Sequence, residues 1–286
     1  MTKQYDDPVA FRAALLARLR NVAAERGQAI QDLQLRLLIE RLLARLFMDP
    51  DPPWRLKGGF AMELRYRPRA RTTRDLDLTI RTVEADSNAT GIDEIRDALQ
   101  EAAEFDLGDH FEFRIGGSTR ALPGAPLGGA TFPVDVVLAG RSFGRFQIDA
   151  GLGDPTGGAA EQLHGDNLLA FAGIEPVTVL AVPKPQQFAE KLHAYTFPWT
   201  GRVNSRSKDL VDLVLLIERG DLVQAEVAAA VAETFARRAT HELSVPIPAP
   251  PAIWQIEFEA MAKQVELSAA TLEVAFERLG QFVGGL

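Results

Sequence analysis

Two aspartates separated by a single leucine end the segment LKGGFAMELRYRPRARTTRDLDLTI, residues 56–80. The alternation around them is typical of a strand, so Asp75 and Asp77 would point to one face while Leu76 and Leu78 enter the core. Paired carboxylates suit Mg²⁺, a hard cation that prefers oxygen ligands and usually keeps water or substrate phosphates as its other ligands. The pair therefore predicts a metal site for phosphoryl transfer.

A third carboxylate from a neighbouring strand would complete such a site. Two strand-like segments supply candidates, Asp149 in FQIDAG and Asp135 in FPVDV. The residues alone leave the choice between them open.

Two glycines precede the aspartates, at the expected start of a short helix. Gly58 and Gly59 leave the backbone free to approach a phosphate group, toward which the first helical amides would point, and Lys57 could add positive charge. A glycine pair is more often a simple turn, and a lone D-x-D pattern is frequent by chance. The order of glycine pair, helix and paired carboxylates is what favours a metal-dependent site that handles a nucleoside triphosphate (NTP).

Composition limits the classes of protein that fit. The 286 residues are 47% hydrophobic and 24% charged, which is ordinary for one large globular domain or two smaller ones. The absence of cysteine excludes disulfides, thiolate zinc sites and cysteine nucleophiles. A net charge of −8 argues against a surface that binds nucleic acid everywhere, although a local basic groove remains compatible with it. Without a long apolar run or a signal peptide, the sequence predicts a cytoplasmic protein that does not enter a membrane.

The order of the expected elements predicts two lobes. Helical spacing occurs in residues 7–47, with a break near Gly27, and again after Gly59, whereas residues 75–80, 111–115, 131–140 and 145–153 have the pattern of strands. Helices are then expected over 180–196, 207–220, 222–239 and 268–283. We expect an α+β protein: an α/β lobe over 1–155, with a mixed or antiparallel sheet after N-terminal helices in 1–48, and a mainly helical lobe over 156–286.

The motifs together resemble a known family. The glycine pair, the D-x-D strand and a later carboxylate are similar to the nucleotidyltransferase superfamily. More closely, LKGGFAMELRY…RTTRDLDLTI, FPVDVVLAGRSFGRFQIDAGLGDP, QQFAEKLHAYT and NSRSKDLVDLVLL resemble the AbiEii/AbiGii toxins of type IV toxin–antitoxin and phage-abortive systems, which include the MenT toxins. The resemblance extends from about Leu56 to Glu218.

The resemblance assigns roles to individual positions. Asp75 and Asp77 match the metal-binding pair, and Asp149 matches the later carboxylate better than Asp135 does. Lys191 corresponds to a helical lysine expected to bind the nucleotide phosphates, and Asp209 to an essential acid that acts as a base or orients this lysine. Without the resemblance, we would interpret Lys191 and Asp209 as surface residues of amphipathic helices.

The same resemblance implies an activity. Family members transfer a nucleoside monophosphate from an NTP to an acceptor, in several cases the 3′ end of tRNA, which blocks translation, and a cognate antitoxin accompanies the toxin. The nucleotide would be bound by Lys57, Gly58, Gly59, Arg71 and Arg74, with Mg²⁺ on the aspartates. Two alternatives remain: transfer to a small-molecule or protein hydroxyl, which the charge of −8 favours, and a non-catalytic nucleotide-binding regulator. Gly59 favours the regulator, because many family members carry serine at this position.

Overall fold

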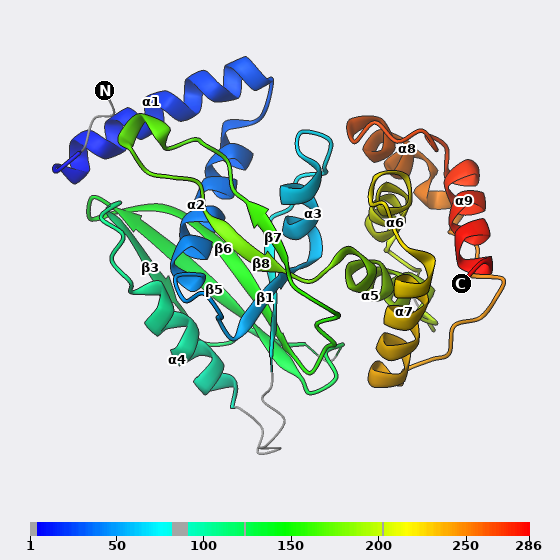
Figure 1. Cartoon of the computed structure of the whole chain (residues 1–286). Coiled ribbons are helices and arrows are strands. Elements are labelled where there is room, and N and C mark those ends of the chain that lie inside the picture. Colours follow the sequence, from blue (N-terminus) through cyan, green and yellow to red (C-terminus); the bar gives the residue numbers. More distant parts are fainter. Residues whose placement is uncertain (1–4, 82–90, 123, 202) are drawn as a thin grey trace. The chain divides into compact units, whose positions relative to one another are not determined.

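The chain forms two compact units, each described separately below. The computed structural model describes residues 5–81, 91–122, 124–201 and 203–286. The first unit comprises Met1–Leu64, Thr72–Gly153 and Gln162–Ala181, and the second comprises Arg65–Arg71, Asp154–Glu161 and Val182–Leu286 (Figure 1).

Two helices open the first unit. Helix α1 (Pro8–Arg26) begins where the Asp7 carboxylate accepts hydrogen bonds from two backbone amides, and it ends at Gly27, whose φ of 61° suits glycine. Helix α2 (Ile30–Leu46) buries a stripe of leucines against the core of this unit. The break expected near Gly27 is thus confirmed.

The strands of the first unit form one sheet. Among the described residues it has eight strands, in the order β3-β5-β6-β2-β1-β8-β7, with β4 paired to β5. Pairs β1–β2 and β5–β6 are antiparallel, whereas β2–β6 and β1–β8 are parallel, so the expected mixed sheet is confirmed. The strands are β1 (Trp54–Lys57), β2 (Asp75–Ile80), β3 (Phe111–Ile115), β4 (Arg120–Ala121), β5 (Gly129–Leu138), β6 (Arg141–Leu152), β7 (Glu161–His164) and β8 (Thr178–Ala181).

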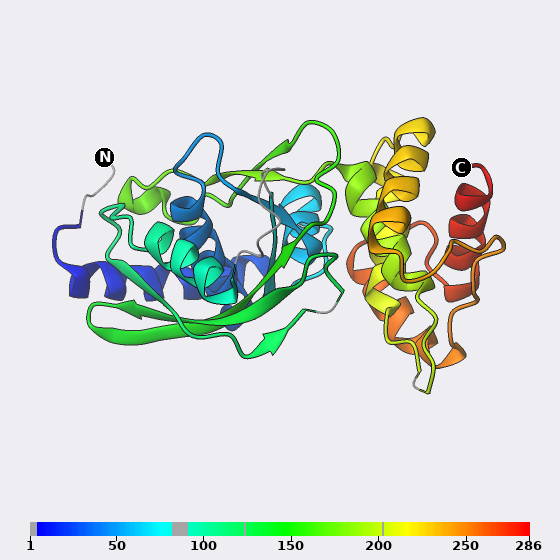
Figure 2. The same ribbon diagram turned by 90° about the horizontal axis from the view of Figure 1, so that it is seen from below.

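Helices cover one face of this sheet. Figure 2 shows α2 and α4 (Ile92–Ala103) on one side of the long green strands β5 and β6. Along β3 and β6 the side chains alternate between buried and exposed, because the buried ones face these helices. The exposed ones, including Arg114, Arg145 and Gln147, define the open face of the sheet. Helix α3 (Gly58–Tyr66) and the short η1 (Ala170–Ala172) complete the connections.

The second unit is built of helices. Its elements are α5 (Lys184–Thr196), α6 (Ser207–Arg219), α7 (Gln224–Arg238), the short η2 (Ala252–Trp254), α8 (Gln255–Gln264) and α9 (Leu272–Gly284). Helix α5 packs against α6 and α7, and α6 packs against α8 and α9. The helix expected over 180–196 begins only at Lys184, since Leu180 and Ala181 belong to β8. None of the helices in the described ranges is long and apolar enough to span a membrane.

Candidate active site

The junction of β1 and α3 brings bare backbone against a carboxylate. Gly58 has a φ of +65°, a conformation that residues with a Cβ rarely adopt. A Cβ added at Gly58 would lie only 1.9 Å from Asp77 Oδ2 and 2.4 Å from Asp77 Cγ. The glycine is therefore required both by its dihedral angle and by the close approach of Asp77.

Strand β2 holds the aspartate pair as its alternation predicts. Leu76 and Leu78 are fully buried, whereas Asp75 is exposed and Asp77 is partly buried. Both carboxylates thus belong to the open face of the sheet.

A row of polar residues crosses the sheet at the level of Asp77. In the register of the strands, Asp77 is paired with Lys57 on one side and with Asp149 on the other. Asp149 is paired in turn with Thr131, and Thr131 with Arg120. Because paired residues point to the same face, this register groups side chains that lie far apart in the sequence.

Two members of this row were not found from the sequence. The buried hydroxyl of Thr131 donates a hydrogen bond of 2.6 Å to Asp149 Oδ1, and a guanidinium nitrogen of Arg120 lies 3.5 Å from Asp149 Oδ2. Arg120 also lies 3.4 Å from the Thr131 hydroxyl. These contacts hold the carboxylate of Asp149 from the side opposite Asp77.

A β-bulge explains why Thr131 could not be identified from sequence. The hairpin pairs Val137 with Ser142 but Val136 with Gly144, so one residue of β6 is added between them. A regular hairpin would place Thr131 opposite Ile148, on the other face. The shift caused by the bulge is what brings Thr131 to Asp149.

The structure distinguishes the two candidates for the third carboxylate by position. Asp149 is next to Asp77 on the adjacent parallel strand. Asp135 is paired with Arg145, with 2.6 Å between Arg145 Nε and Asp135 Oδ1. Only Asp149 therefore lies beside the aspartate pair.

The fit of a metal ion can be judged from these donors. Within the described ranges, no three His, Asp or Glu side chains already form a cluster that could hold a metal ion. The register nevertheless places the carboxylates of Asp77 and Asp149 on one face of adjacent strands, with Asp75 two residues away on the same face. Their oxygens are the ligand type that Mg²⁺ prefers, so the donor set fits this ion.

A buried ion pair fixes the segment that leads into β2. Glu63 of α3 is 2% exposed and accepts a hydrogen bond from the guanidinium of Arg36 on α2. Its other oxygen accepts a bond of 3.2 Å from the backbone amide of Thr73, two residues before Asp75. Glu63 thus ties together α2, α3 and the start of the aspartate strand.

The second unit contains a buried group of four ions. Lys191 Nζ lies 2.6 Å from Asp212 Oδ2 and 3.2 Å from Asp209 Oδ1. Asp212 also accepts two hydrogen bonds from Arg71, of 3.0 and 2.7 Å, in bidentate geometry. Lys191 is 6% exposed, Asp209 9% and Asp212 1%, so the interpretation of Lys191 and Asp209 as surface residues is wrong. Arg206 lies 3.5 Å from Asp209 at the edge of the group.

The ions of this group hold each other in the charged state. Burial alone would lower the pKa of Lys191, but the carboxylates of Asp212 and Asp209 outweigh it and raise that pKa. Burial would likewise raise the pKa of Asp212, but Lys191 and Arg71 together lower it. Lys191 is therefore a fixed cation at neutral pH.

Three arginines of the arginine-rich segment, residues 65–74, form ion pairs within the second unit. Arg65 Nε lies 2.8 Å from Glu161, Arg69 Nε lies 2.6 Å from Glu266, and Arg71 binds Asp212 within the second unit. Arg74, in the first unit, has a side chain that is 79% exposed and lies 3.7 Å from Asp32. Of the predicted nucleotide-binding arginines, Arg71 is thus part of the buried ion group and Arg74 is open to solvent.

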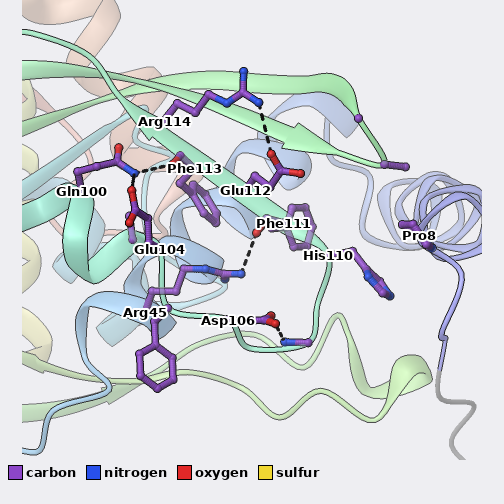
Figure 3. Close-up of a pocket in the computed structure, with 15 residues that line it drawn as sticks. Pro8, Arg45, Gln100, Glu104, Asp106, His110, Phe111, Glu112, Phe113 and Arg114 are labelled. Carbon is purple, nitrogen blue, oxygen red and sulfur yellow. Dashed lines mark hydrogen bonds and ion pairs between the residues drawn. The ribbon is translucent and has the colours of Figure 1, made fainter.

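A cavity of about 720 Å³ lies elsewhere in the first unit, between α4 and β3. Figure 3 shows two of its polar side chains bound to the edge of β3: Arg45 donates to the carbonyl of Phe111, and Gln100 donates to the carbonyl of Phe113. Gln100 also accepts a bond from the amide of Ile115. These groups close the edge strand, and this cavity is separate from the aspartate row.

Comparison with known proteins decides the family. A family model described as the nucleotidyl transferase AbiEii toxin of type IV toxin–antitoxin systems matches residues 41–278, most of the chain. The chain belongs to the AbiEii nucleotidyltransferase toxin family. The resemblance found in its motifs is therefore confirmed.

A solved structure shares the fold of this AbiEii chain. The chain is similar to MenT4, the nucleotidyltransferase toxin Rv2826c of Mycobacterium tuberculosis H37Rv, with a TM-score of 0.63 and 20% identity over 94% of this chain and 89% of that one. A nucleotidyltransferase-like antigenic protein from Paracoccidioides brasiliensis aligns with 75% of this chain and 96% of that one, at a TM-score of 0.39 and 14% identity. No curated protein matches the sequence.

Proposed function

We propose that this type IV toxin transfers a nucleoside monophosphate from an NTP to the 3′ end of tRNA, with release of pyrophosphate. Supporting this proposal is the row in which Asp77 is paired with Asp149 on a parallel strand and packs against the backbone of Gly58. Such a row offers carboxylates for Mg²⁺ beside backbone that a phosphate can approach closely. A cognate antitoxin is implied by the family.

The carboxylates of Asp75, Asp77 and Asp149 would hold the metal. Bound there, Mg²⁺ would neutralise the charge that develops on the phosphate oxygens as the acceptor hydroxyl attacks the α-phosphate. Lys57, Gly58 and Gly59 would bind the triphosphate through an ammonium group and backbone amides, and Arg74 would add an exposed guanidinium.

The second unit would contribute fixed charge to the nucleotide. Lys191 stays protonated because Asp209 and Asp212 flank it, which suits binding of phosphate oxygens. Asp209 would orient this lysine. Arg71 would act through Asp212, since its guanidinium binds that carboxylate.

The test is incubation of the purified protein with total tRNA, Mg²⁺ and each α-labelled NTP in turn. The Asp77→Asn variant removes a charge from the row without changing the size of the side chain, and Asp135→Asn is the matched control on β5. We expect one NTP to label tRNA with the wild type and the control. Labelling should fall about a hundredfold or more in Asp77→Asn, because mutation of residues that only orient metal ligands already costs ~10–100-fold. Omitting Mg²⁺ should abolish labelling as well.

Other results would redirect the assignment. If the wild type binds an NTP but labels no RNA, the acceptor is a small molecule or a protein hydroxyl, as the net charge of −8 favours. If Asp77→Asn leaves transfer unchanged, the aspartate row is not the catalytic site. Binding of NTP without transfer to any acceptor would instead indicate a regulator.

A further inference from the structure

A second cavity, of about 610 Å³, lies in the first unit directly beside Asp75. Its walls come from α2, the start of β2, and the strands β5 and β6. It opens where β6 extends beyond β2: Asp75, the first residue of β2, is already paired with Gln147, whereas β6 begins at Arg141. Residues 141–146 of β6 therefore have α2, and not β2, beside them.

The walls of this cavity are held by specific contacts. The side-chain amide of Gln34 on α2 donates a hydrogen bond to the backbone carbonyl of Phe143 on β6. A Cβ at Gly144 would lie 2.4 Å from Leu38 Cδ1, so the glycine lets α2 approach the strand closely. The distance between helix and strand, and with it the depth of the cavity, is set by this contact.

The lining suits a nucleobase. Gln31, Gln34 and Gln147 bring side-chain amides, which can both donate and accept hydrogen bonds as base edges do. Apolar side chains of Leu35, Leu38, Pro133 and Phe146 provide surface against which a base can pack. The lining also includes the charged residues Asp32, Arg74, Asp75 and Arg145, so apolar surface and polar groups are both present. A concave site of this size is typical for a small organic group.

Two exposed guanidinium groups lie at the rim of the cavity. The side chains of Arg74 and Arg145 are 79% and 72% exposed, with Arg74 3.7 Å from Asp32 and Arg145 Nε 2.6 Å from Asp135. Each guanidinium carries further N–H donors that suit phosphate oxygens. On the same open face, beyond the cavity, the side chain of Arg120 is 67% exposed. A small acceptor would contact the cavity alone, whereas a nucleic-acid strand could also contact Arg120.

We propose that this cavity binds the terminal nucleotide of a single-stranded nucleic-acid acceptor, with Arg145 on its phosphates and the glutamine amides on its base. This assignment rests on the proposed function. It would place the terminal 3′-hydroxyl near Asp75. The rest of the strand would follow the open face of the sheet toward Arg120.

The test measures RNA binding separately from catalysis. A short single-stranded RNA with a free 3′-hydroxyl and a 5′ fluorophore is titrated with protein in the absence of NTP, at low and at moderate salt. Arg145→Glu is compared with Arg114→Glu, which reverses a charge of similar exposure (69% against 72%) in the same row of the sheet but outside the cavity. Gln147→Glu, at the cavity wall, is the second variant. A fluorescent NTP analogue is titrated in parallel.

Arg145→Glu should weaken RNA binding roughly tenfold, the effect of one charge-assisted hydrogen bond, and Gln147→Glu should weaken it as well. Arg114→Glu should change RNA binding about twofold or less, and NTP binding should be the same in all variants. Equal effects of Arg145→Glu and Arg114→Glu, no effect of either, or no RNA binding by the wild type would overturn the proposal. If the wild type transfers no nucleotide at all, the proposed function fails, but the RNA titrations still decide the role of the cavity.

Discussion

At the scale of single residues, the Thr131 hydroxyl is positioned to control Asp149. Thr131→Val keeps the shape of the side chain but removes the 2.6 Å hydrogen bond to the carboxylate. We expect kcat for nucleotidyl transfer to fall about tenfold, because Asp149 would lose its fixed orientation, while KM for the NTP stays nearly constant. Thr131→Ser, which restores the hydroxyl, should recover most of the activity. Full activity in Thr131→Val together with a loss in Thr131→Ser would mean that Thr131 acts through packing only.

Asp212 is another residue whose effect can be predicted, since it compensates two buried cations. In Asp212→Ala, Lys191 and Arg71 would lose the carboxylate that both of them bind. We expect the free energy of unfolding to fall by about 3 kcal/mol, as for other broken buried ion pairs, and urea denaturation measures it. Asp209→Ala should cost less, because Asp209 lies 3.2 Å from Lys191 and 3.5 Å from Arg206 at the edge of the group. A loss below about 1 kcal/mol in Asp212→Ala would contradict this account.

At the scale of elements, the turn from β1 into α3 allows a controlled test of glycine. Gly58→Ala combines an unfavourable positive φ with a Cβ 1.9 Å from the carboxylate of Asp77, whereas Gly140→Ala has a similar φ of +67° and no atom within 4 Å. Both should lose about 1 kcal/mol of stability from backbone strain. Only Gly58→Ala should also abolish nucleotidyl transfer, because Asp77 would have to move. Equal activity of the two variants would show that the close approach at Gly58 has no catalytic role.

The same elements show how far sequence patterns can predict this fold. Strand β2 was predicted over its observed range, because its alternation is strict and one of its faces is buried. Strands β1 and β8 were missed, since each has only four residues, too few for a periodic pattern to distinguish strand from helix. Helix α8 was missed as well, because a Pro-rich segment precedes it.

Sequence patterns likewise predict only part of the candidate site. Asp75, Asp77 and the glycines could be predicted because they are neighbours in sequence. The burial of Lys191 could not be predicted, because its ion group includes Arg71, which binds Asp212 although the two are 141 residues apart in the sequence. Thr131 could not either, since its place depends on the bulge in β6.

At the scale of the whole molecule, the buried His193 and the partly buried His241 of the second unit should make its stability depend on pH. A chain of hydrogen bonds links Arg238, His193, Thr240, His241 and Thr196, with Nδ1 of His193 facing the guanidinium of Arg238 and Nε2 2.9 Å from the Thr240 hydroxyl. Arginine can only donate, so Nδ1 must accept and His193 must be neutral. Burial and then Arg238 lower the pKa of His193 to about 3, and burial lowers the pKa of His241 as well.

The sign of the effect follows from these pKa values. The unfolded chain binds a proton at each histidine near pH 6.5, whereas the folded unit binds it only at lower pH, so stability is complete above about pH 6.5 and is lost as pH falls. Buried carboxylates such as Asp109 and Asp212 have lowered pKa values, so they add to the loss of stability only below about pH 4. Between about pH 6.5 and pH 5, His193 alone should cost about 2 kcal/mol.

Chemical denaturation followed by the fluorescence of Trp254, which is buried in the same unit, measures this dependence. His193→Gln should flatten the fall in stability over that pH range, even if its stability at neutral pH is lower. His164→Gln, at an exposed histidine of β7, should keep the wild-type slope. Parallel slopes for the wild type and His193→Gln would mean that His193 is protonated in the folded unit, against the tautomer that Arg238 requires.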